Sequence, residues 1–236
     1  MLEELEKRIQ EAVERRVFFD ANEFPWVREV EAQWPQMRKE LDRLLTAIEV
    51  LPGFEEIQVE QKQVTDDKRW KIFPLFAYGN WLDDNARRCP ETARVVRMIP
   101  GLQAAMFSVL QAHKDIPPHR GVYSGVLRYH LGLKIPQPET QCGICVDGIR
   151  AYWQEGKSLI FDDRHMHEAW NRSDEDRIVL FVDFTRPLPD SLARLNEAAL
   201  ADIGTSPFIC NAIERWRQWE VTHGSKLDEI LGRGVG

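Results

Sequence analysis

The spacing of apolar and polar residues changes twice along this chain of 236 residues. In the first fifty residues, apolar positions such as Leu5 and Ile9 recur at helical intervals among charged residues. The Phe24-Pro25-Trp26 segment interrupts this pattern, and Leu51-Pro52-Gly53 ends it with typical turn residues. The pattern therefore predicts two helices, which form a helical lead-in over residues 1–55.

Short runs with strand-like patterns fill the middle of the chain. The first two are IQVEQKQV, which begins at Ile57, and WKIFPLF, which begins at Trp70. The further predicted strands cover residues 104–110, 125–133, 142–148, 149–156, 157–163, 167–173 and 177–185. Turn sequences such as Asp147-Gly148 separate them, and one helix is expected between Glu91 and Ile99. Many short strands with regular turns favour an all-β sandwich or barrel.

The last part of the chain returns to a helical pattern. We therefore predict one domain over residues 1–236, with a mainly β core at residues 56–187 and C-terminal helices at residues 188–236. No stretch approaches the eighteen or so apolar residues of a membrane span, and the N-terminal residues lack the apolar region of a secretory signal.

Composition narrows the class of protein. A hydrophobic fraction of 43% is ordinary for a globular chain, and the formal net charge of -7 argues against nucleic acids and anionic membranes as main partners. Four cysteines do not make a disulfide framework, so we expect reduced thiols and a cytoplasmic location. We also expect a monomer. The Cys142-Gly-Ile-Cys145 sequence predicts buried thiols in a strand or hairpin rather than a zinc or redox site.

Histidines supply the candidate metal ligands. His119 follows Pro117-Pro118, which predicts an extended entry into a strand. His165 and His167 are two residues apart and face the same side if both lie in a strand. Neutral imidazoles bind iron, and a His-x-His pair also binds zinc. Spacing alone does not choose between these histidines, and each also fits a hydrogen-bonded core position.

Gly121 stands where an iron site of the facial-triad type has its acid, two residues after His119. With glycine at this position, the third side of an iron ion must be taken by water, chloride or a remote acid. The candidate acids are Asp115, Asp162, Asp163 and Glu168. Each of these acids fits a turn-forming or solvated position better than a position as an iron ligand.

Two arginines are candidates for holding an anion. Arg177 opens the most apolar strand of the chain, where its charge is costly unless it is paired. Arg128 alternates with His130, so both face one side of their strand. These side chains form either an anion pocket or the ordinary surface face of an amphipathic strand, and the pattern favours neither.

The chain resembles the aspartyl/asparaginyl β-hydroxylase family of Fe(II)- and 2-oxoglutarate-dependent oxygenases over roughly residues 65–187. The order and spacing of several motifs, including the unusual glycine, match together. They are Ser108, His119-x-Gly121, Leu127-Arg128-Tyr129-His130-Leu131-Gly132-Leu133, Glu155-Gly156-Lys157, Phe161-Asp162-Asp163, His167-Glu168-x-Trp170, Arg177 and Val182-Asp183-Phe184.

The resemblance implies a double-stranded β-helix, a jelly-roll or cupin-like fold. It implies that His119 and His167 bind the iron without a carboxylate and that Arg177 binds the distal carboxylate of 2-oxoglutarate; these three are the expected catalytic residues. Further cosubstrate contacts are implied for Ser108, Arg128 and His130. Trp70-Lys71 resembles a stretch that flanks the family's substrate pocket.

The expected activity is hydroxylation of an unactivated C–H bond, with O2 consumed and 2-oxoglutarate converted to succinate and CO2. The sequence shows no counterpart of the membrane anchor and helical repeats of animal members, nor of the membrane segments of lipid A hydroxylases. We therefore expect a small substrate: an amino acid, a peptidyl Asp or Asn, or another small acidic molecule. Four arginines are candidates for positive charge at the pocket rim, although each alone fits a solvated surface position better: Arg120, Arg150, Arg164 and Arg172. The alternatives are a 2-oxoglutarate-dependent halogenase and a non-catalytic jelly-roll binding module.

Overall fold

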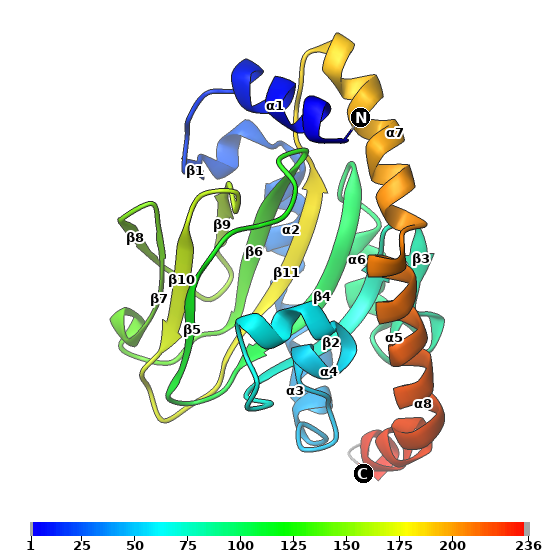
Figure 1. Cartoon of the computed structure of the whole chain (residues 1–236). Helices are drawn as coiled ribbons and strands as arrows, with labels where there is room; N and C mark the ends of the chain where they lie inside the picture. The colour runs from blue at the N-terminus through cyan, green and yellow to red at the C-terminus, as the bar shows by residue number, and fades with distance from the viewer. Residues whose placement is uncertain (1, 234–236) are drawn as a thin grey trace.

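The computed structural model describes residues 2–233, which form two antiparallel β-sheets with helices around them (Figure 1). The larger sheet contains, in spatial order, β1 (Phe18–Phe19), β9 (Ser158–Phe161), β6 (Val126–Lys134), β11 (Arg177–Thr185), β4 (Leu102–Leu110), β2 (Trp70–Ala77) and β3 (Asn80–Trp81). The smaller sheet contains β5 (Lys114–His119), β10 (His167–Asn171), β7 (Cys142–Val146) and β8 (Ile149–Tyr152). This is the predicted double-stranded β-helix core.

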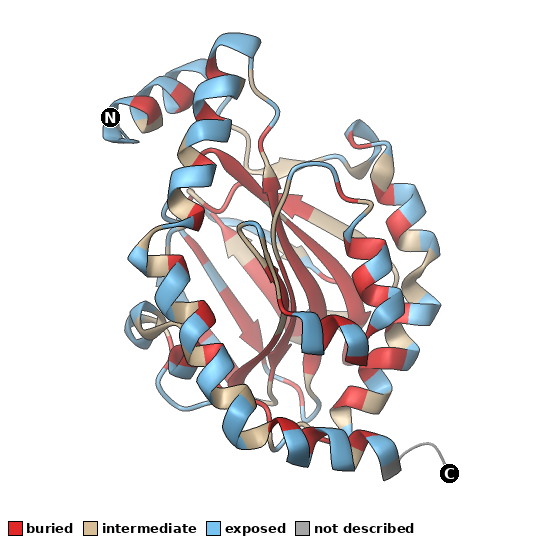
Figure 2. Ribbon diagram, turned by 90° about the vertical axis from the view of Figure 1, so that its right-hand side faces the viewer, coloured by how far each residue is buried: buried red, intermediate tan, exposed pale blue. Residues whose placement is uncertain are grey.

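Helices precede, interrupt and follow the strands. They are α1 (Leu2–Ala12), η1 (Ala21–Glu23), α2 (Trp26–Ala32), α3 (Trp34–Leu45), α4 (Phe54–Ile57), η2 (Val59–Gln63), α5 (Asp83–Arg88), α6 (Pro90–Val96), η3 (Glu139–Gln141), α7 (Asp190–Gly204) and α8 (Pro207–Arg233). Helix α3 packs on β6 and α6, α1 packs on α7, and α8 contacts α4. Figure 2 shows the buried strands of the larger sheet between outer helices whose outward faces are exposed.

Strand β11 is the centre of the larger sheet, because it pairs with β4 on one side and β6 on the other. Its β-branched and aromatic residues suit a strand that is buried on both faces. Residues alternate between those faces, so Arg177, Val179 and Phe181 share one face. Ring contacts between Phe161 of the larger sheet and His167 of the smaller sheet show that this interior lies between the sheets.

The prediction of a strand over residues 57–64 is wrong. This segment forms α4 and η2 instead, although its apolar and polar residues alternate. The Gly53 N–H donates to the carboxylate of Glu56, and the Gln58 N–H donates to the Phe54 carbonyl, so a capped helical turn satisfies the backbone locally. Ile57 is buried in this turn, which explains its place in the pattern.

The helical lead-in also differs from the expectation of two helices. It contains α1, α2 and α3, and between α1 and α2 the residues Phe18 and Phe19 pair with β9 as an added strand. The prediction of an extended backbone at His119 is confirmed, but this residue ends β5 instead of leading into a strand. The turn at Asp147-Gly148 is also confirmed, with φ angles of 49° and 83°. In the described part of the chain, no helix combines the length and apolar character needed to cross a membrane.

Candidate active site

His119 and His167 lie opposite each other on neighbouring strands of the smaller sheet. They are paired in register between β5 and β10, and their ring centroids are 4.1 Å apart. The Nδ1–H of His119 donates to the Pro117 carbonyl, and that of His167 donates to the His165 carbonyl, both at 2.9 Å. A hydrogen bond from Nδ1 fixes the tautomer and leaves the Nε2 lone pair available to a metal ion.

Burial keeps both imidazoles neutral at physiological pH. It lowers the pKa of His119, and together with His119 and Arg128 it lowers the pKa of His167 to about 3. Neutral imidazole is the form that coordinates iron. No cluster of three or more His, Cys, Asp or Glu side chains that could hold a metal occurs among residues 2–233, so these two imidazoles form the candidate donor set.

His165 does not share the position of His167. It precedes β10, and its Nδ1 lies 3.4 Å from Oδ2 of Asp147, away from the histidine pair. The two histidines were expected to face the same side only if both lay in a strand, and His165 does not lie in one. Of the two histidines, His167 is the one that lies against His119, so the geometry favours His167 as the candidate ligand.

The Asp163 carboxylate fills the space beside Gly121. A Cβ atom at Gly121 would overlap that carboxylate, and the Gly121 N–H donates to the Asp163 carbonyl at 2.8 Å. Burial raises the pKa of Asp163, while Arg128, with Nη2 at 2.9 Å from its Oδ2, opposes this rise. Of the four remote acids considered, Asp163 is thus the one that lies at the glycine; Asp162 instead pairs with arginines.

A second group of buried polar side chains lies on β4, β6 and β11. Ser108 is opposite Val179, and His130 is opposite Phe181, which puts both on the face of β11 that carries Arg177. The Trp153 indole N–H donates to Nδ1 of His130 at 3.3 Å, so the imidazole proton resides on Nε2. That Nε2 is buried and has no hydrogen-bond partner in residues 2–233.

Arg177 is the least compensated charge of this group. Its side chain is 2% exposed, and its Nε and Nη1 atoms have no hydrogen-bond partner among the described residues. Its Cζ lies 4.5 Å from the centroid of the Trp153 ring. Burial lowers the pKa of Arg177 to about 10, so it remains a cation at neutral pH. A buried, unpaired guanidinium beside the Nε2–H of His130 is a ready site for a carboxylate.

Arg128 faces the same side as His130, as expected, but its guanidinium is already paired. It donates to both carboxylate oxygens of Asp183, at 2.9 and 3.1 Å, and it forms the ion pair with Asp163. Its Cζ also lies 4.3 Å from the centroid of the Phe181 ring. Two carboxylates and an aromatic face therefore hold Arg128 next to Gly121.

Ring contacts join the histidine pair to the group of buried polar side chains around Arg177. The centroid of Phe161 is 5.8 Å from that of His167 and 5.2 Å from that of His130. The candidate metal ligands on one sheet and the candidate anion-binding side chains on the other thus face a shared interior. The sequence did not identify Trp153 as a site residue, although it contacts both His130 and Arg177. The one sequence feature that pointed to it is its position in the predicted strand over residues 149–156.

A cavity of about 190 Å³ opens onto His119. Its polar end includes His119, Arg120, Gly121, Arg128 and Asp163. Most of the remaining wall is apolar and comes from α4, β2, β4 and α8. The apolar side chains include Phe54, Ile57, Trp70, Ile72, Met106, Phe208, Ile209, Ile213 and Trp216.

The sequence matches known hydroxylases. Residues 31–187 match the family model described as aspartyl/asparaginyl beta-hydroxylase. An ornithine lipid ester-linked acyl 2-hydroxylase from Rhizobium tropici is 43% identical over 91% of this chain and 76% of its own length. The human aspartyl/asparaginyl beta-hydroxylase is 27% identical over 68% of this chain but only 21% of its own length. The human aspartate beta-hydroxylase domain-containing protein 2 is 34% identical over 52% of this chain and 35% of its length.

Proposed function

This chain belongs to the aspartyl/asparaginyl β-hydroxylase family, and on that premise we propose that it is an Fe(II)- and 2-oxoglutarate-dependent hydroxylase of acyl chains. The observation that carries the choice of substrate is the apolar cavity that opens onto His119. The similarity to an acyl 2-hydroxylase over most of the chain supports the same choice.

The residues fit the proposed iron and cosubstrate. His119 and His167 offer two neutral Nε2 atoms to Fe(II), and the unpartnered atoms of Arg177 and His130 offer donors to a keto acid. When bound, the iron and 2-oxoglutarate supply the oxidation of a C–H bond by O2, with succinate and CO2 as by-products. The protein supplies the binding, the orientation and the exclusion of water.

Each polar side chain has a distinct role in this proposal. Arg177 binds the distal carboxylate of 2-oxoglutarate, and Ser108 and His130 add hydrogen bonds. Ser108 Oγ accepts from the Trp70 indole N–H at 2.9 Å, which leaves its own hydroxyl proton free to donate. Arg128 acts mainly as a positioning residue, because it holds the Asp163 carboxylate beside Gly121.

Asp163 is the acid that can order solvent at the open side of the histidine pair. Its Oδ1 is buried and accepts no hydrogen bond from residues 2–233, so this oxygen is available to a water molecule. Asp163 thus supplies a carboxylate near the candidate metal ligands, although the position two residues after His119 is a glycine. It gives Gly121 a physical role, since any side chain there would displace Asp163.

The cavity suits a hydrocarbon chain better than the small acidic substrate that the sequence suggested. The cations in its wall are Arg120 and Arg128, and Arg128 is already paired with two carboxylates. The apolar part of the wall includes Ile213 and Trp216 of α8 and Trp70 and Ile72 of β2. Burying a methylene group in such a wall contributes about 0.8 kcal/mol, so a chain of several carbons is bound strongly.

A matched pair of variants on α8 tests the substrate. Ile213 lines the cavity, whereas Val221 on the same helix is 89% exposed. We expect Ile213→Ala to raise the KM for an acyl substrate roughly tenfold while leaving the requirement for 2-oxoglutarate unchanged, and we expect Val221→Ala to change neither. Succinate and product mass are the readouts. If Ile213→Ala leaves the KM for acyl substrates unchanged, the chain does not lie along this wall.

A further inference from the structure

We propose that a second cavity, beside the apolar one, binds an oxyanion, a phosphate or carboxylate, at the head of the substrate. This proposal rests on the proposed function, because it adds the polar end of the same acyl substrate. The substrate class is then an anionic amphiphile, with its chain along the apolar cavity and its charged group among the arginines of the second cavity.

The second cavity has a volume of about 270 Å³ and is strongly basic. Its wall is formed by Gln10, Val13, Arg15, Arg120, Arg164 and His165, and none of these six residues carries a carboxylate. It adjoins the apolar cavity, since both are lined by Arg120. Asp163, which lines the apolar cavity, directly precedes Arg164 in the chain. A molecule that extends from one cavity to the other therefore passes Arg120.

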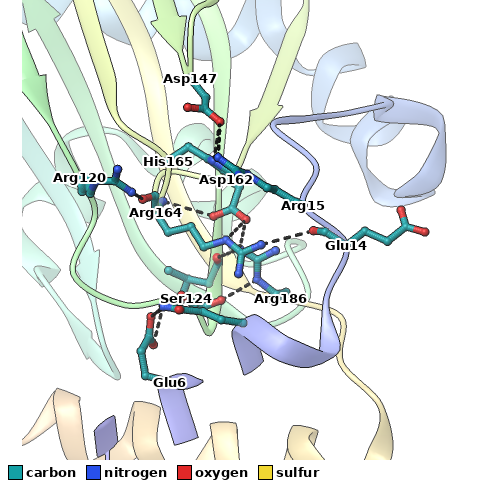
Figure 3. Close-up of polar contacts among 12 residues, drawn as sticks. Glu6, Glu14, Arg15, Arg120, Ser124, Asp147, Asp162, Arg164, His165 and Arg186 are labelled. Atoms are coloured by element: carbon teal, nitrogen blue, oxygen red, sulfur yellow. Dashed lines mark hydrogen bonds and ion pairs between the residues drawn. The ribbon is translucent and has the colours of Figure 1, made fainter. Parts of the chain in front are cut away.

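Two arginines of this cavity, Arg164 and Arg120, are positioned by contacts with the protein (Figure 3), whereas the side chain of Arg15 is 81% exposed. Arg164 Nε lies 2.7 Å from Oδ2 of the fully buried Asp162, and its Nη2 donates to the Glu14 carbonyl at 3.3 Å. Asp162 also pairs with Arg186 at 2.8 Å, so one carboxylate is shared by two guanidinium groups. Arg120 donates to the Arg164 carbonyl at 3.1 Å. The lining residues of the cavity thus include three guanidinium groups and no carboxylate.

His165 provides an independent observation that points to a ligand in this cavity. Its side chain is buried, with 6% exposed, and its Nε2 has no hydrogen-bond partner in the part of the chain that the structure describes. Buried polar atoms of this kind are almost always hydrogen-bonded. The acid that faces this group is Asp147, whose Oδ2 lies 3.4 Å from His165 Nδ1 and 3.2 Å from Arg15 Nη2. An oxyanion in the cavity would supply the missing partner for Nε2.

Two arginines that the sequence placed with this group lie elsewhere and serve as controls. Arg150 and Arg172 lie over the ring of Trp170, with Cζ at 5.9 and 5.5 Å from its centroid, and neither lines the second cavity. Arg15 and Arg120 are exposed like them, so all four can be replaced by glutamine with little effect on folding.

The test is equilibrium binding of three probes to the metal-free protein: octyl phosphate, octyl glucoside and inorganic phosphate. Isothermal titration calorimetry would give the Kd of each. We expect wild type to bind octyl phosphate at least tenfold more tightly than octyl glucoside. The double variant Arg15→Gln/Arg120→Gln should weaken octyl phosphate binding by roughly tenfold for each guanidinium and leave octyl glucoside binding unchanged. Arg150→Gln/Arg172→Gln should behave as wild type.

Three outcomes would overturn the proposal. They are equal affinity of wild type for octyl phosphate and octyl glucoside, full retention of octyl phosphate binding in Arg15→Gln/Arg120→Gln, and an equal loss in the control variant. Inorganic phosphate that binds as tightly as octyl phosphate would assign the cavity to a free anion and overturn the headgroup assignment. Because these titrations need no iron or 2-oxoglutarate, loss of hydroxylation alone would count against the proposed function and not against this cavity.

Discussion

Replacement of Arg177 by methionine should affect stability and cosubstrate binding in opposite directions. The guanidinium is 2% exposed and two of its nitrogens lack hydrogen-bond partners within residues 2–233, so the protein without cosubstrate carries a buried, uncompensated charge. Methionine fills a similar volume without that charge. We therefore expect Arg177→Met to be more stable than wild type without 2-oxoglutarate and to bind 2-oxoglutarate poorly.

The lowered pKa of Arg177 sets the size of the stability change. The fall of the Arg177 pKa from its ordinary value to about 10 corresponds to about 3 kcal/mol of unfavourable burial of the charged form. Loss of the contact with Trp153 removes about 0.5–2 kcal/mol of stabilisation, which leaves a net gain of about 1–3 kcal/mol. For a chain of this size, each kcal/mol raises Tm by about 2–4 °C.

The same substitution removes the cation that we assign to the distal carboxylate of 2-oxoglutarate. Loss of a buried, charge-assisted contact costs about 2–5 kcal/mol, so the Kd should rise by roughly 30-fold or more. Differential scanning calorimetry with and without 2-oxoglutarate measures both effects: wild type should gain Tm on adding the keto acid, and Arg177→Met should not.

Arg97→Met is a matched control. Arg97 is exposed, and its Cζ lies 3.9 Å from the Trp81 ring centroid. The substitution therefore removes a similar stacking contact without removing a buried charge. It should lose a little stability and keep the response to 2-oxoglutarate. The reasoning would be refuted if Arg177→Met unfolded at a lower temperature than wild type and still gained Tm on adding 2-oxoglutarate.

Three further predictions concern the histidines and the glycine. His167→Ala should abolish Fe(II) binding in anaerobic calorimetry, whereas His165→Ala should retain it; equal loss in both would contradict the assignment. Gly121→Ala should lower the free energy of unfolding by about 1–3 kcal/mol, because its Cβ overlaps the Asp163 carboxylate, while Gly232→Ala, which meets no atom within 4 Å, should not. The free energy of unfolding of the metal-free protein should fall as pH drops from about 6.5 toward 3, because His167 binds a proton in the unfolded chain but stays neutral when folded. Denaturant titrations over this pH range measure the fall, which should be smaller in His167→Ala.

The sequence predicted most of the β core because its strands have simple causes. The apolar run that starts at Arg177 and the alternating run around His130 became β11 and β6, where burial on one or both faces matches the pattern. The strand predicted after Ile57 is wrong because an alternation of apolar and polar residues over a short segment also fits a capped helical turn. There the hydrogen bond from Gly53 to Glu56, which pattern alone does not weigh, decided the local structure.

The site was predicted unevenly for a similar reason. His119 and His167 could be paired only through the resemblance, since their contact depends on the register of β5 and β10. Asp163 was placed among turn-forming acids because its offset from the histidines is unusual, and its role emerges only when the Gly121 backbone is seen against its carboxylate. The apolar cavity was missed altogether, because its wall joins α4 and α8 from opposite ends of the chain.

The most direct test of the central claim is the stoichiometry of succinate and hydroxylated product with matched substrates. The purified protein, supplied with Fe(II), 2-oxoglutarate and O2, would be given an acyl lipid and, in parallel, an aspartyl peptide. We predict one succinate formed for each acyl chain that gains one oxygen, and little turnover of the peptide. Oxygen insertion into the peptide with no acyl product, or no succinate with either substrate, would contradict the account.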